Sequence, residues 1–206
     1  MVQTVRAVRR YCGEAADGAW SIKVTYLRPS DSRAQSLLRQ LGREKQGVVG
    51  RCSPDGRSLL VIADATTPAG AAILRHETAH AVLAQAWFPA AGAVPFWLGE
   101  GLSTLFEMGV DAVGDPLANR EREEVLRYLL QTRRRLPLQA IFSSALMQRA
   151  SGNSYAIAWG LLWLERERGV TGRALLERAR ANPPFNADEI KDLERGLRRR
   201  FGATSA

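Results

Sequence analysis

The 206-residue chain contains few histidines, cysteines and lysines. Its two cysteines, Cys12 and Cys52, are too few for a disulfide framework and lack the spacing of a zinc knuckle, and the sequence leaves open whether they pair. Only three of the 29 basic residues are lysines, so the net charge of +8 comes from scattered arginines. Their densest runs, 133–135 and 198–200, are expected at helix ends, where cations complement the helix dipole. Because no basic stripe is interleaved with aromatic residues, we predict no nucleic-acid partner.

The sequence also lacks export and membrane signals. Its N-terminus has no apolar core of a signal peptide, so the protein is either cytoplasmic or a trimmed form of an exported one, and the compartment stays open. Nineteen residues without charge, 81–99, could suggest a membrane span, but two prolines and a glycine interrupt them. We expect two buried helix segments joined by a tight loop instead, and no membrane span.

The first third of the chain shows the patterns of a small sheet with one helix. Residues 20–27 alternate apolar and polar, which predicts a strand with one buried face. Residues 30–44 have helical spacing that is stopped by Gly42. Residues 47–52 and 58–63 flank the turn signal "SPDG" and predict a hairpin. The second of these strands could lie at a sheet edge and pair with an extended substrate, or it could simply complete the sheet.

The remainder of the chain predicts helices. Thr67 can cap a helix that has Pro68 at its first position and runs to about residue 87. A second helix is expected at about 96–108, and others at 117–135, 139–149, 154–168, 172–182 and 187–201. A sheet followed by helices indicates an α+β fold. We predict a single domain over 1–206, with an N-terminal extension at about 1–19, a sheet-containing part at 20–66, a helical part at 67–201 and a loose tail at 202–206.

The segment "HETAH" contains both histidines of the chain, four residues apart. On a helix His76 and His80 project from one face and can bind one Zn²⁺. Glu77 is rotated by about 100° from His76, so it can act as a base on a water at the metal without being a ligand. The alternative is a chance pairing of two histidines.

A catalytic zinc requires a third protein ligand and an open fourth position. Glu100, in "PFWLGEGLSTLFE", is the candidate, because a carboxylate among apolar residues is costly to bury without a partner. The turn between the two helices would bring it to the histidines. The alternative is a surface glutamate in the first turn of its helix, where the helix dipole favours it.

Together, "HETAH" and Glu100 within "WLGEGLSTLFE" resemble the gluzincin zinc metallopeptidase superfamily, and more closely its small bacterial peptidase-MA-like domains. The later helix "SYAIAWGLLWLERERG" is also similar, and the likeness covers roughly residues 20–200. It implies a zincin-like metallopeptidase half, a zinc cofactor on His76, His80 and Glu100, and a peptide or protein substrate. It also implies that Glu77 is the general base and that Tyr155 donates a hydrogen bond to the oxyanion. The alternative for Tyr155 is a packing role.

The sequence departs from the larger members of this superfamily at two points. An aspartate four residues after the glutamate ligand is replaced here by Thr104, so support for a ligand would come from Thr104, Ser103, Glu107 or a backbone carbonyl. Glu107 is equally well explained as a solvent-facing residue. No counterpart of the motif that grips a free substrate N-terminus is present, which favours an endopeptidase.

Two other classes of function are weighed against this hypothesis. The chain could be a zincin-fold binding or regulatory module that holds zinc with little turnover, gated by a regulatory partner that the sequence does not identify. The intact Glu77 argues against it, because loss of this residue would be the simplest way to disable such a site. A basic nucleic-acid-binding protein ranks last.

Overall fold

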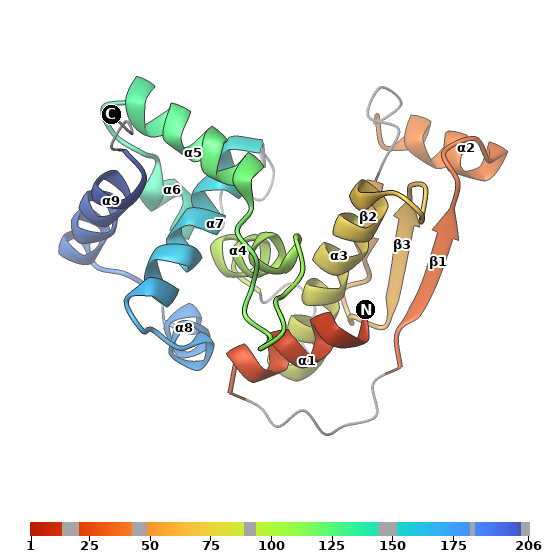
Figure 1. Ribbon diagram of the computed structural model, residues 1–206, viewed down its shortest axis with the longest axis horizontal. Coiled ribbons are helices and arrows are strands. Elements are labelled where there is room, and N and C mark those ends of the chain that lie inside the picture. The colour runs from red at the N-terminus through yellow and green to blue at the C-terminus, as the bar shows by residue number, and fades with distance from the viewer. Residues whose placement is uncertain (14–20, 43–48, 89–93, 144–151, 182–183, 203–206) are drawn as a thin grey trace. The chain divides into compact units, whose positions relative to one another are not determined.

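The protein has an α+β fold, described here from a computed structural model for residues 1–13, 21–42, 49–88, 94–143, 152–181 and 184–202 (Figure 1). In these residues a mixed sheet is formed by β1 (Lys23–Leu27), β2 (Val49–Cys52) and β3 (Ser58–Ile62). The helices are α1 (Val2–Tyr11), α2 (Ser32–Gln40), α3 (Pro68–Ala86), α4 (Phe96–Phe106), α5 (Arg120–Thr132), α6 (Leu138–Phe142), α7 (Gly152–Glu167), α8 (Gly172–Ala179) and α9 (Ala187–Phe201). The predicted fold class is therefore confirmed.

Contacts divide the chain into two compact units, and each is described by itself. The first unit comprises Met1–Arg9, Ala15–Ala93 and Phe106–Leu117; the second comprises Arg10–Glu14, Val94–Leu105 and Ala118–Ala206. The first unit thus holds the sheet with α2 and α3, and the second holds most of α4 and the later helices. That the chain forms a single domain stays a prediction.

The sheet of the first unit has the strand order β1-β3-β2. β3 pairs in parallel with β1, with Val24 opposite Leu59, and antiparallel with β2, with Gly50 opposite Val61. The hairpin of β2 and β3 is confirmed, and Gly56 in its turn has a φ of +69°. Of the two interpretations of strand 58–63, the structure supports the one in which the strand completes the sheet, because β3 has a partner on each side.

Helices cover both faces of this sheet. On one face, Ala34 and Leu38 of α2 form a buried cluster with Ile62. On the other face, α3 contacts β2 and β3 (Figure 1), and the Tyr26 hydroxyl donates to the carbonyl of Gly70. The prediction that the first strand has one buried face is therefore wrong: Thr25 and Leu27 are half-buried, like Val24 and Tyr26.

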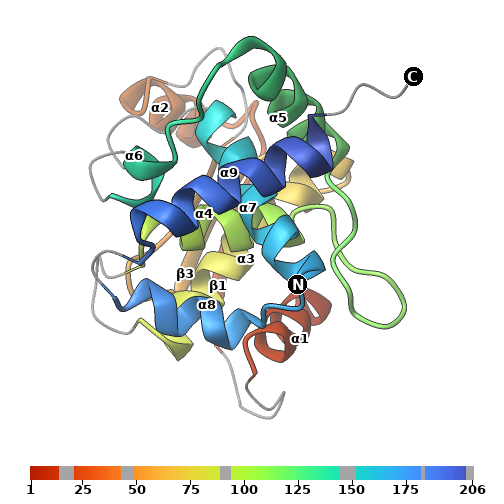
Figure 2. The same cartoon turned by 90° about the vertical axis from the view of Figure 1, so that its left-hand side faces the viewer.

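The second unit is a helical assembly around α7, which contacts α5, α6 and α9 (Figure 2). Trp159 of α7 is fully buried, and its ring lies 5.7 Å from that of Phe201. Gly160 of α7 faces Leu126 of α5 at a distance that leaves no room for a side chain. The absence of a side chain on Gly160 therefore lets α5 and α7 approach closely.

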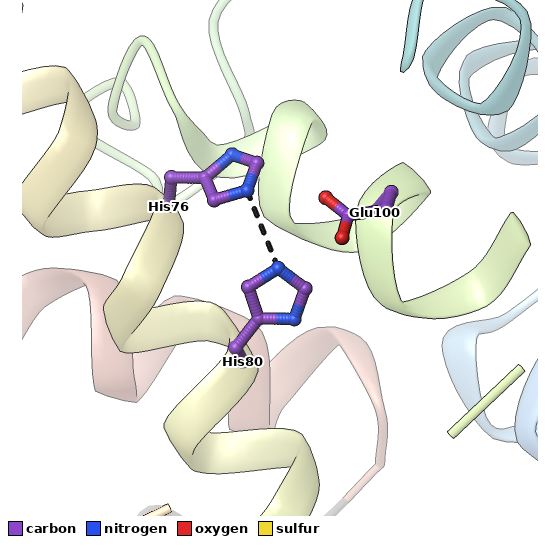
Figure 3. A group of neighbouring side chains, drawn as sticks. All are labelled: His76, His80 and Glu100. Carbon is purple, nitrogen blue, oxygen red and sulfur yellow. Dashed lines mark hydrogen bonds between the residues drawn. The ribbon is translucent and has the colours of Figure 1, made fainter. Parts of the chain in front are cut away.

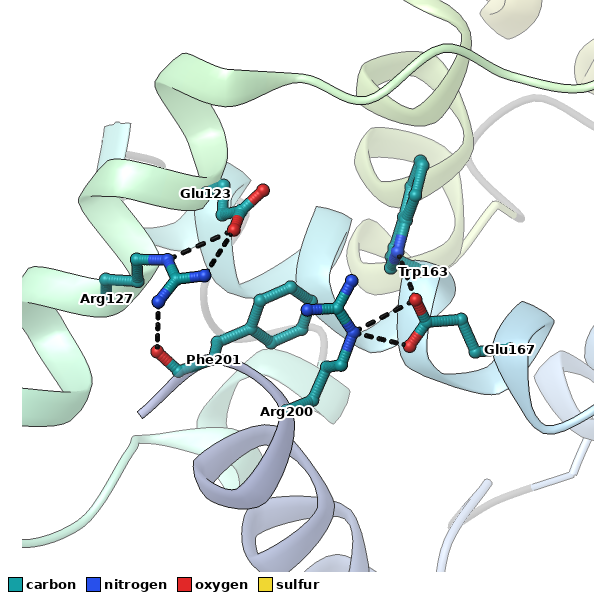
Figure 4. A network of polar contacts seen from close by, with 6 residues as sticks. All are labelled: Glu123, Arg127, Trp163, Glu167, Arg200 and Phe201. Atoms are coloured by element: carbon teal, nitrogen blue, oxygen red, sulfur yellow. Dashed lines mark hydrogen bonds and ion pairs between the residues drawn. The ribbon is translucent and has the colours of Figure 1, made fainter. Parts of the chain in front are cut away.

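Arginines tie the end of α9 to its neighbours in the second unit. Arg127 of α5 pairs with Glu123 and donates to the carbonyl of Phe201, whereas Arg200 pairs with Glu167, which also accepts from Trp163 (Figure 4). Arg198 donates to three carbonyls at the end of α5 and in the residues after it, Leu130, Arg133 and Arg134. These arginine runs lie at helix ends, as predicted.

Several boundaries differ from the predictions. α4 ends at Phe106, two residues early, α5 is shorter at both ends, and the N-terminal extension contains the helix α1, which was not predicted. The expected loop at 89–93, Trp20, most of the predicted helix end at 144–149 and most of the tail lie outside the described residues. In the part that is described, no helix has the length and apolarity to cross a membrane.

Candidate metal centre

Helix α3 carries the histidines, and its start is well determined by local chemistry. The side chain of Thr67 accepts a hydrogen bond from the backbone N–H of Gly70 at 3.1 Å, and Pro68 occupies the first helical position, where its missing N–H costs nothing. The helix continues to Ala86, so "HETAH" lies in its middle. The motif therefore sits on a rigid segment, away from the ends where helices fray.

His76 and His80 lie on one face of α3, as predicted, and their rings point toward each other (Figure 3). Their Nε2 atoms are 3.3 Å apart, the ring centroids are 5.0 Å apart, and the rings are tilted by 66°. Both side chains are half-buried. Two nitrogens at this distance either share one proton in a hydrogen bond, or both direct lone pairs at a cation.

Glu77 is buried, and its carboxylate lies next to strand β2. A Cβ atom placed on Gly50 would overlap the Glu77 carboxylate, so this carboxylate lies directly against the β2 backbone. Burial, followed by the charge of Glu77, raises the pKa of the nearby Cys52 thiol to about 12. The base candidate thus has a neutral thiol and a bare strand backbone as neighbours.

Glu100 belongs to the second unit and is the fifth residue of α4. It is half-buried, between Gly99 and Gly101, which are both buried. The alternative of a surface glutamate in the first helical turn is wrong, because Glu100 lies beyond that turn. Thr104 donates its hydroxyl proton to the carbonyl of Glu100 at 2.6 Å, with a longer contact to Gly101. Thr104 therefore supports the helix backbone at Glu100.

The other predicted residues have clear structural surroundings. Tyr155, the fourth residue of α7, packs in the second unit, with its ring 5.9 Å from that of Phe96 and 5.7 Å from the Arg122 guanidinium. These contacts fit the packing role and leave the donor role a prediction. Ser103 is fully buried in α4.

Glu107 follows the end of α4 and is half-buried, and its role in supporting a ligand stays a prediction. Its carbonyl accepts from Arg75 Nε at 2.7 Å, and Arg75 directly precedes His76. Glu107 therefore braces α3 through its backbone carbonyl.

Sequence reasoning missed the residues that surround Glu77. Gly50 and Cys52 come from β2, a strand that the sequence placed in a hairpin without indicating what it would face. Their alternation along the strand was a signal that they share a face, but the identity of the opposing helix depends on the tertiary fold. Cys12 is buried, Cys52 is half-buried, and the two do not form a disulfide with each other.

Comparisons with known proteins give no match. No family model matches this chain, and the searches of curated proteins and of solved structures also found no match. The likeness to gluzincins therefore rests on the motif residues quoted above. It stays a prediction, and the function must be argued from the site.

Proposed function

We propose that the protein is a zinc-dependent metallopeptidase of the gluzincin type. His76, His80 and Glu100 would be the zinc ligands, and Glu77 would be the general base. The 3.3 Å separation of the two histidine Nε2 atoms carries this proposal. Two ligands at 2.0–2.1 Å from a tetrahedral zinc are separated by about 3.3–3.4 Å. The pair on α3 therefore already has the spacing that a bound zinc would require.

Glu100 supports the proposal as the third ligand. Glu100, on α4 of the second unit, would contribute the carboxylate that completes the proposed ligand set. Two imidazoles and one carboxylate form a donor set found in catalytic zinc sites, which keep a fourth position open. A structural site would instead need a fourth protein ligand.

The chain's own residues would divide the reaction between them. When bound, zinc supplies a Lewis acid and lowers the pKa of water toward about 7. Glu77 would accept the proton from the attacking water and pass it to the leaving amine. Tyr155 is the candidate for a phenol donor to the oxyanion of the tetrahedral intermediate. The Glu77 carboxylate is buried and lies against β2.

The sheet favours a peptide over other substrates of metal-assisted hydrolysis. In the described residues β2 is an outer strand, paired with β3 along one side. An extended peptide can add to such a strand through backbone hydrogen bonds. Because the Glu77 carboxylate lies at Gly50 of the same strand, a peptide bound there would run past the proposed base.

The test is zinc content and peptide hydrolysis in four proteins: wild type, Glu100→Ala, Glu77→Gln and Glu124→Ala. Glu124 is an exposed helix glutamate and serves as the matched control. We expect about one zinc per chain in wild type, Glu77→Gln and Glu124→Ala, and much less in Glu100→Ala. Hydrolysis of a quenched fluorescent peptide mixture should fall at least about 100-fold in Glu77→Gln.

Two results would contradict the proposal in different ways. If the wild type held no zinc after reconstitution, the spacing of the two histidines in "HETAH" would be a chance pairing. One zinc per chain without hydrolysis by the wild type would favour the alternative of a zinc-holding binding module.

A further inference from the structure

The Glu77 carboxylate and the strand backbone at Gly50 are in unusually close approach. A Cβ on Gly50 would overlap a Glu77 carboxylate oxygen and would lie 2.7 Å from both Glu77 Cγ and Ile73 Cγ2. Ordinary contacts of a Cβ begin at about 3.4 Å. All three residues belong to the first unit. The space that a side chain at position 50 would occupy is therefore taken by the proposed base.

Glycine at position 50 is required by space and not by backbone conformation. Gly50 is absent from the glycines with positive φ, and it pairs regularly with Val61 in the antiparallel ladder. Any L-residue could adopt such a strand conformation, and most would stabilise it, because glycine weakens a strand interior. What glycine provides here is room for the carboxylate.

Cys52 shares the face of β2 that carries Gly50, two residues further along. The charge of Glu77 contributes to the raised pKa of Cys52, so the thiol is protonated at neutral pH and adds no negative charge beside the carboxylate. The pKa of Cys52 therefore also reports how close the Glu77 carboxylate lies to the thiol.

We propose that Gly50 is a positioning residue for Glu77. The bare backbone of β2 at Gly50 holds the catalytic carboxylate in place, and we call this contact the Gly50–Glu77 contact. The proposal rests on the proposed function for the role of Glu77, but the Gly50–Glu77 contact can be tested without assuming that function. A base has to be held to within about 0.5 Å of its productive position, and a displacement of about 1 Å can cost about 100-fold in rate. A methyl group at position 50 would cause such a displacement while leaving the histidines in place.

The first test uses zinc-free protein and needs no activity. The pKa of Cys52 is measured from the pH dependence of its alkylation, by peptide mass spectrometry, in wild type, Gly50→Ala, Glu77→Gln and the double variant. Glu77→Gln removes the charge, so the Cys52 pKa should fall. Gly50→Ala should also lower it, because the carboxylate is pushed away, and it should have little effect in the Glu77→Gln background. A Cys52 pKa in Gly50→Ala equal to that of the wild type would overturn the proposal.

The second test separates turnover from binding in the zinc-loaded enzyme. We expect Gly50→Ala to keep one zinc per chain and a KM within about threefold of wild type, while kcat falls by about 100-fold. Arg51→Ala, an exposed change on the opposite face of β2, is the control and should leave kcat unchanged. Retention of the wild-type kcat by Gly50→Ala would overturn the proposal.

A third variant guards against a purely structural effect. Ile73→Ala in the Gly50→Ala background makes room for the new methyl group without releasing Glu77. We expect kcat to stay as low as in Gly50→Ala, because the methyl group still meets Glu77. Recovery of kcat would show that Gly50 acts through packing on Ile73, and would overturn the positioning role. If the wild type bound no zinc or hydrolysed no peptide, the proposed function would be refuted. The Cys52 measurement would still decide whether the Gly50–Glu77 contact exists.

Discussion

The turn of the hairpin offers a quantitative test of how the sheet is fixed to the histidine-bearing helix. Gly56 has a φ of +69°, and a Cβ there would lie 2.5 Å from the carbonyl oxygen of Ala81 in α3. Gln85 of α3 donates to the Gly56 carbonyl at 2.7 Å. Gly56→Ala therefore combines a backbone cost and a packing cost. The left-handed conformation costs an alanine about 1–2 kcal/mol, and overpacking adds about 1–3 kcal/mol.

Gly42 is a matched control in the same unit. Its φ is +62°, but nothing lies within 4 Å of a Cβ built there, so Gly42→Ala should lose only the backbone part, about 1–2 kcal/mol. The free energy of unfolding is measured by urea denaturation with a chelator present, so that zinc binding does not contribute. Gly56→Ala should be less stable than Gly42→Ala by about 1–3 kcal/mol, or about 2–12 °C in Tm. Equal losses in the two variants would show that the turn does not pack on α3 as described.

Two further predictions concern the same unit. Thr67→Ala removes the acceptor for the Gly70 N–H and should lower the free energy of unfolding by about 1 kcal/mol. Thr67→Ser keeps a hydroxyl acceptor and should retain most of the stability in the same urea assay. An equal loss of stability in both variants would contradict the capping role of Thr67. Because the pKa of Cys52 is raised to about 12 in the folded protein, its contribution to stability is present below the usual thiol pKa of about 9 and is lost as pH rises from there toward 12. The free energy of unfolding should therefore decline over this range in wild type and decline less in Cys52→Ala, and identical slopes would contradict the raised pKa.

The histidine-bearing helix was predictable because its signals are local. The capping threonine, the proline at the first position and the spacing of "HETAH" all act within a few turns, and α3 begins where they indicate. The same holds for α9, whose Asn186 and Glu189 form a reciprocal capping box. The face shared by His76 and His80 follows from helix geometry alone.

The order of the strands was not predictable in the same way. The apolar run "SLLVI" of β3 has buried residues on both faces, which is typical of a central strand, yet the sequence alone left open whether it lies at an edge or completes the sheet. Which strand lies outermost is decided by pairing between segments far apart in sequence. The helix α1 was missed because its buried residues, Thr4, Ala7, Val8 and Arg9, include only two apolar side chains and do not form an apolar pattern in the sequence.

The two tasks of α3 are separated by its geometry, and this determines which changes should affect catalysis without affecting the metal. The histidines project from one face of the helix, whereas the proposed base Glu77 lies against the backbone of β2 at Gly50. A shift of β2 against α3 therefore moves the base relative to a peptide on that strand, but it leaves the 3.3 Å histidine pair intact. Substitutions along the contact between α3 and the hairpin, such as Gly56→Ala, should lower kcat before they lower zinc content. The opposite order would mean that the helix, rather than the strand, yields to the added side chain.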